Sequence, residues 1–130
     1  ICYWSHHELE IVRHFLPRNI AKRFEAVSLN VKPMADRYLN RRGQKLTDSD
    51  DKALNTYLSA ISPKSALVNA PSVGAAESCR RLDSYSTNQK KWSNWDDRQK
   101  EIATDLVRYN REDCRATAKI MGKCFPAPRG

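Results

Sequence analysis

The 130-residue sequence contains no apolar run approaching the roughly 18 residues that a membrane span requires, so we expect no transmembrane helix and no membrane partner. It has no Cys-x-x-Cys and no Cys/His pair at zinc-finger spacing, which argues against a structural zinc site. Internal repeats and low-complexity tracts are also missing. We therefore expect one soluble domain over residues 1–130.

The cysteines are few and widely separated. They are Cys2, Cys79, Cys114 and Cys124. The even count permits disulfides, but no signal peptide is visible, and Cys2 and Cys114 stand in apolar sequence. We expect reduced thiols and a cytoplasmic protein.

Acidic residues are outnumbered by basic ones. Lys and Arg number 23 against 15 Asp and Glu, which gives a net charge of +8. Such a balance favours a polyanionic partner, nucleic acid above all. The basic residues are spread along the chain, with short clusters at 41–42, 80–81 and 90–91, so a solvated basic surface is an equally good explanation at this point.

Apolar periodicity and breaker residues divide the chain mostly into helices. The opening four residues are apolar and β-prone, like the interior of a strand, and we interpret the chain as a truncated piece of a longer protein. The expected elements are a strand at 1–4, a helix at 5–16, a further helical turn at 19–24, a short strand at 26–31, helices at 33–42, 50–61, 72–83 and 96–123, and a polar loop at 86–95.

One carboxylate on the last expected helix falls where a charge is costly. At about 100° per residue, Asp113 lies near the middle of an apolar stripe. The stripe consists of Ile102, Leu106, Tyr109, Ala116 and Ile120. An unpaired charge facing a core or a cleft costs several kcal/mol. Asp113 is therefore either paired with an arginine or a backbone donor at the edge of the stripe, or it has a function.

Glu8 raises the same question on the first expected helix. It falls inside the arc that Leu9, Val12, Phe15 and Leu16 define as buried. A capping box, in which Glu8 reaches back to an N-cap at Ser5, is the structural alternative. Two inward carboxylates repel one another unless a cation lies between them, and Mg²⁺ or Mn²⁺ suits hard oxygen ligands. A pair of such ions about 3.5–4 Å apart can hold the attacking and leaving oxygens of a phosphodiester.

Tyr109 stands four residues before Asp113 and therefore one helical turn away on the same face. A phenol at that place could hydrogen-bond a metal-activated water. The structural alternative is a core aromatic with its hydroxyl at the surface.

The stretch YNREDCRAT, residues 109–117, resembles the third motif, Y-x-x-x-D, of the tyrosine-type DEDD 3′–5′ exonucleases in the ribonuclease H-like superfamily. It is most similar to the Y-x-x-x-D-C-x-A-T form of a predicted RecB-associated nuclease family. The start, YWSHHELEIV, is similar to the second motif, with Glu8 at the carboxylate position. There His7 stands where an aromatic residue is usual, and Glu replaces the commoner Asp. The first motif, D-x-E, has no counterpart in these residues, and we expect it upstream of Ile1.

The resemblance implies an α/β class and a ribonuclease H-like fold, of which this chain is the C-terminal part and a predominantly helical one. It implies a metal-dependent nuclease, a 3′–5′ exonuclease acting on DNA or RNA. Asp113 and Glu8 would be ligands of Mg²⁺ or Mn²⁺, and Tyr109 would orient the attacking water. Without the two carboxylates of the first motif, we expect this piece to be a poor catalyst or none.

Trp92 and Trp95 lie in the polar loop beside Lys90 and Lys91. Tryptophans beside lysines could stack on the bases of a single strand of nucleic acid. The alternative is that they are hydrophobic pegs that hold the loop to the body. The rival to the nuclease is a non-enzymatic basic helical module that binds nucleic acid or a protein partner.

Overall fold

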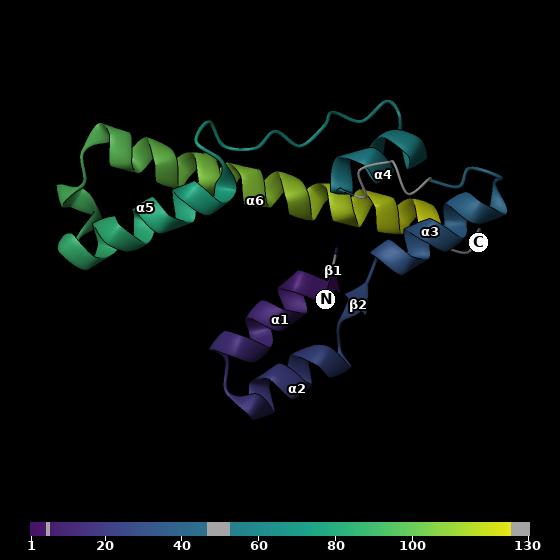
Figure 1. The fold of residues 1–130 in the computed structure, drawn as a ribbon, viewed down its shortest axis with the longest axis horizontal. Coiled ribbons are helices and arrows are strands. Elements are labelled where there is room, and N and C mark those ends of the chain that lie inside the picture. The colour runs from purple at the N-terminus through teal and green to yellow at the C-terminus, as the bar shows by residue number, and fades with distance from the viewer. Residues whose placement is uncertain (5, 47–52, 126–130) are drawn as a thin grey trace, which may run out of the picture. The chain divides into compact units, whose positions relative to one another are not determined.

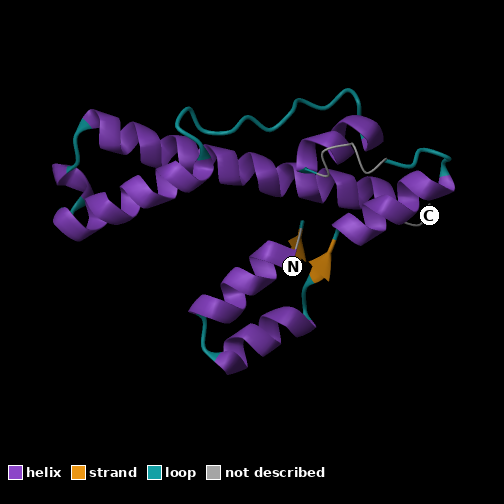
Figure 2. Ribbon diagram, viewed as in Figure 1, coloured by secondary structure: helices purple, strands orange, loops and turns teal. Residues whose placement is uncertain are grey.

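A computed structural model describes residues 1–4, 6–46 and 53–125. The described chain is mostly helical, with one small two-stranded parallel sheet (Figure 2). Its contacts divide it into two compact units, residues 1–67 with 114–130, and residues 68–113. Within the described residues, no helix combines the length and the apolar character needed to cross a bilayer.

The sheet of the first unit joins two short strands that are separated by two helices. Strand β1 (Cys2–Tyr3) pairs in parallel with β2 (Leu29–Asn30), with Cys2 opposite Leu29. Helices α1 (His6–Phe15) and α2 (Arg18–Ala26) make the crossover that parallel pairing requires (Figure 1). An ion pair between Arg13 and Glu25 joins these two helices.

The strand expected at 26–31 is confirmed only at its end. Helix α2 continues to Ala26, and the Val27 and Ser28 amides still bond back to carbonyls of that helix. The first half of the segment expected to be a strand, residues 26–28, therefore forms the end of helix α2 and its C-terminal cap.

Helices α3 (Lys32–Arg41) and α4 (Leu54–Ile61) carry most of the core of the first unit. Pro33 lies in the first turn of α3, where no amide hydrogen is needed, and Gly43 follows its end at φ +70°, a left-handed conformation that favours glycine. The most buried apolar side chains of this unit come from these helices, from the residue before α3 and from the last helix, α6 (Asp97–Cys124). They are Val31, Ala35, Leu39, Tyr57, Leu58 and Ile120.

The second unit contains α5 (Ala75–Asn88), a 3₁₀ turn, η1 (Trp92–Asn94), and the first part of α6 (Asp97–Cys124). Helix α6 agrees with its expected bounds within one residue. Helix α5 begins and ends later than the expected 72–83, so the loop prediction is wrong for residues 86–88. There the Ser86 and Thr87 hydroxyls donate to the Asp83 carbonyl and let polar residues continue the helix.

The buried arc expected on the first helix is partly wrong. Leu9 is buried, but Phe15 is 75% exposed and Leu16 is 42% exposed. Helix α1 packs on α2, and this contact leaves its last turn uncovered. Three of the cysteines are exposed, namely Cys2, Cys79 and Cys114. A short sequence window cannot say which apolar faces find a partner.

Candidate functional site

Helix α6 places Tyr109 and Asp113 on one face, one turn apart, in the last turns of the second unit. Both side chains are half-buried, and the Tyr109 hydroxyl is hydrogen-bonded to the Asp113 carboxylate. Ile102, Ala116 and Ile120 are buried, so the apolar stripe on this helix is confirmed. Asp113 is therefore a partly buried carboxylate with a phenol as one of its partners.

The surroundings of Tyr109 stabilise its neutral form. Its pKa is raised above the ordinary 10.0, first because the phenol is partly buried and then because of the charge of Asp113 and the hydrogen bond to it. The phenol therefore stays protonated at neutral pH and is no general base there. Its proton is donated to Asp113, while its oxygen lone pairs remain able to accept a hydrogen bond from a water.

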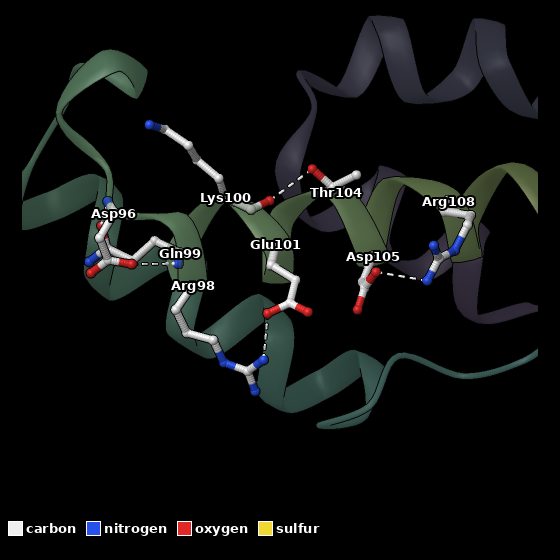
Figure 3. Close-up of polar contacts among 8 residues, drawn as sticks. All are labelled: Asp96, Arg98, Gln99, Lys100, Glu101, Thr104, Asp105 and Arg108. Atoms are coloured by element: carbon white, nitrogen blue, oxygen red, sulfur yellow. Dashed lines mark hydrogen bonds and ion pairs between the residues drawn. The ribbon is translucent and has the colours of Figure 1, made fainter.

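Other carboxylates on α6 are arranged differently. Glu101 pairs with Arg98 at 2.6 Å and Asp105 pairs with Arg108 at 2.7 Å, each three residues apart (Figure 3). These are ordinary ion pairs between helical neighbours, and such pairs contribute little to stability. Asp113 is distinguished from them by its phenol partner.

The start of α6 is fixed by a reciprocal cap. The Gln99 amide donates to Asp96 Oδ1 at 2.8 Å, and the Asp96 amide donates to Gln99 Oε1 at 3.1 Å (Figure 3). This arrangement satisfies two amides near the helix N-terminus that have no partner within the helix. It fixes where the helix starts.

Glu8 lies half-buried in the first turn of α1, in the first unit. Asp113 belongs to the second unit, so the convergence of these two carboxylates stays a prediction. The capping box expected for Glu8 cannot be assessed, because Ser5 lies outside the described residues.

The described part of the chain does not form a complete metal site. It contains no group of three or more His, Cys, Asp and Glu side chains arranged to hold an ion. A two-metal site needs several carboxylates, of which unit two supplies Asp113 as a candidate. Binding of Mg²⁺ or Mn²⁺ by Asp113 and Glu8 therefore stays a prediction.

A second cluster lies in the turn between α5 and α6. Trp95 contacts Tyr85 edge-on at 5.9 Å, and Trp92 contacts Trp95 at 5.3 Å with the rings tilted by 41°. Lys90 and Lys91 directly precede Trp92 and are exposed. Tyr85 was not expected here, because its contact with Trp95 crosses the turn and has no signature in a helical pattern.

Comparison with known proteins gives no relative to which this chain can be assigned. No protein-family model matches it, and neither a curated protein nor a solved structure matches it significantly. Function is therefore inferred from the chemistry of these two clusters and from the motif that contains Tyr109 and Asp113.

Proposed function

We propose that the chain is the C-terminal part of a ribonuclease H-like nuclease domain that cleaves single-stranded DNA or RNA from its 3′ end. The supporting observation is the hydrogen-bonded pair of Tyr109 and Asp113, half-buried on α6 within a Y-x-x-x-D-C-x-A-T stretch. Burying part of a carboxylate costs free energy, so its presence beside a neutral phenol favours a functional site. A site that binds a metal ion and positions a water would use both groups.

Tyr109 orients the attacking water. Because its own proton is donated to Asp113, the phenol oxygen accepts a hydrogen from the water and holds it at a defined angle. Partial burial raises the pKa of this phenol above the ordinary 10.0, so the hydroxyl stays protonated through the neutral range. A positioned hydrogen-bond partner of this kind contributes rate through orientation.

Asp113, with Glu8, is the proposed contribution of this chain to binding of Mg²⁺ or Mn²⁺. Such ions supply a nucleophilic water at neutral pH and stabilise charge on the phosphate. The described residues do not complete this set, so the proposal requires a D-x-E pair from sequence encoded before Ile1.

One observation favours the rival function, a basic binding module. The first unit contains 15 of the 23 Lys and Arg and 7 of the 15 Asp and Glu, which accounts for the whole net charge of +8. The second unit is neutral. A polyanion would therefore be attracted to the first unit whether or not the chain takes part in cleavage.

The deciding experiment is manganese-dependent hydrolysis of a 5′-labelled single strand by the protein extended with any sequence encoded before Ile1. We expect stepwise cleavage that Asp113→Asn abolishes. Glu101→Gln removes an exposed carboxylate from the same helix and should leave the rate unchanged. An upstream sequence without a strand bearing D-x-E, or an extended protein that binds the strand and never cleaves it, would leave the basic binding module as the function.

A further inference from the structure

The two tryptophans of the turn between α5 and α6 have different environments. Trp95 is half-buried, its ring contacts Tyr85, and its indole Nε1 donates to the Gln89 carbonyl at 2.7 Å. Trp92 is 52% exposed, and its ring contact is with Trp95. Trp95 therefore holds the turn to the unit, whereas Trp92 leaves about half of its surface open to a partner.

Hydrogen bonds hold the backbone that presents Trp92. The Asn94 amide donates to the Lys91 carbonyl at 3.0 Å, and the Trp95 amide donates to the Trp92 carbonyl at 3.1 Å. The Asn94 side chain also donates to Gln89 Oε1 at 3.3 Å. Because the turn is already ordered, a ligand that stacks on Trp92 need not first order this backbone.

The charges beside Trp92 favour an anionic partner. Lys90 and Lys91 are exposed, and within the described residues neither forms an ion pair. The nearby carboxylate of Asp96 is occupied by capping α6. An exposed indole beside two available ammonium groups suits a ligand with a flat ring and a phosphate, which is the repeating unit of a single strand.

We propose that this turn is a stacking platform for an unpaired base of a single strand, with Trp92 under the base and Lys90 and Lys91 at the adjacent phosphates. A duplex keeps its bases stacked inside and offers no free face to Trp92. The platform therefore selects single strands over duplex.

The platform lies in the turn that leads directly into the helix of the proposed cleavage site. From Asp97 to Tyr109 is twelve residues of α6, or about 18 Å at 1.5 Å per residue. That length equals about five stacked nucleotides at 3.4 Å each. If the proposed function holds, and this step rests on it, strands shorter than about five nucleotides cannot occupy both places and should be cut poorly.

Binding is tested separately from cleavage, with the metal removed by chelation so that no strand is cut. The probe is a fluorescein-labelled thymidine strand of about ten nucleotides, within the roughly 4–16 that such sites cover, followed by fluorescence anisotropy. We expect Trp92→Phe to bind within about threefold of wild type, because it keeps an aromatic face. Trp92→Leu keeps apolar bulk without that face and should bind about 5- to 100-fold more weakly.

Two controls locate the effect. Phe15→Leu makes the same type of change at an aromatic side chain that is 75% exposed in the first unit, and it should not change affinity. Replacing both Lys90 and Lys91 by Gln should reduce the slope of log affinity against log salt by about 1.4, or 0.7 per phosphate. Circular dichroism and thermal unfolding confirm that each variant is folded.

The proposal is overturned if Trp92→Leu binds like wild type, if Phe15→Leu weakens binding as much, or if a duplex of the same length binds as tightly as the strand. Failure of wild type to bind at low salt also overturns it. If Trp92→Leu weakens binding but the extended protein never cleaves the strand, the nuclease is refuted and the platform is kept. If the extended protein cleaves normally and Trp92→Leu binds the strand like wild type, the platform is refuted and the nuclease is kept.

Discussion

The Tyr57 hydroxyl donates a hydrogen bond of 2.5 Å to Asp36 Oδ1, which joins α4 to α3 in the core of the first unit. The Tyr57 ring is fully buried and meets Trp4 edge-on at 4.9 Å. Three segments that are distant in sequence therefore meet at one side chain.

This contact predicts a loss of stability at alkaline pH. Burial, the hydrogen bond to Asp36 and the charge of Asp36 all raise the pKa of Tyr57 in the folded protein above the ordinary 10.0. Folding thus favours the protonated phenol, so its contribution is complete below pH 10 and declines as the pH rises toward the folded pKa. Urea unfolding between pH 7 and 11 should show this decline, and Tyr57→Phe should reduce it.

At neutral pH, Tyr57→Phe should lower the free energy of unfolding by about 1.5 kcal/mol, the cost of one hydrogen bond to a charged group. Tyr38→Phe is the matched control, because it removes a tyrosine hydroxyl bonded to Arg42 on the exposed side of α3. It should keep the alkaline decline of wild type. Equal pH curves for wild type and Tyr57→Phe would mean that Tyr57 is not the group responsible.

A second prediction concerns the charge of the first unit. Arg37 and Arg41 are exposed and lie one turn apart on α3. If this charge attracts a single strand, changing both to Gln should reduce the slope of log affinity against log salt by about 1.4. Changing Arg98 and Arg108 to Gln in the neutral second unit, where both already pair with carboxylates, should change the slope less.

Salt titrations of the anisotropy of a labelled strand measure these slopes. Affinity that does not depend on salt would show that the net charge of +8 is a solvated surface and contributes nothing to binding.

How much of the fold the sequence predicts depends on the length of each pattern. Helix α6 has a long apolar repeat and a capping box, so its bounds follow from local rules. Strands β1 and β2 are two residues each and exist because they pair with one another, which is a non-local event. The exposure of Phe15 depends on what packs against α1, and the same periodicity would describe a covered or an uncovered face.

In the candidate site, too, features set by local spacing can be predicted from the sequence, whereas features set by tertiary contacts cannot. The pairing of Tyr109 with Asp113 follows from a spacing of four residues on one helix. The different environments of Trp92 and Trp95 depend on Tyr85 and Gln89 across the turn, and no periodicity encodes that contact. The convergence of Glu8 with Asp113 is a matter of tertiary placement and remains a prediction.

A third prediction tests the role of Tyr109 in the extended protein. Tyr109→Phe removes the hydroxyl that orients water and should lower kcat by roughly 10²–10⁴-fold, the range of general acid–base contributions. Because the pKa of Tyr109 is raised above 10.0, the pH dependence of kcat/KM below pH 10 should keep its wild-type shape. A limb of the wild-type profile that disappears in Tyr109→Phe would instead identify the tyrosine as an ionising catalyst.

The last prediction separates a metal-ligand role of Asp113 from a structural one. Asp113→Asn keeps an amide oxygen that can accept the Tyr109 hydrogen bond, so this contact survives without the charge. If Asp113 lies near other carboxylates, removing its charge also relieves repulsion, and the metal-free protein should lose less than about 1 kcal/mol or become more stable. If Asp113 instead anchors a buried salt bridge, the variant should lose about 3–5 kcal/mol, because the partner charge is left unpaired.

Urea unfolding in chelator measures the difference, with Asp105→Asn as the control that breaks a surface ion pair worth about 0–1 kcal/mol. A large loss of stability with manganese-dependent cleavage intact would show that Asp113 is a structural residue and would remove it from the proposed site.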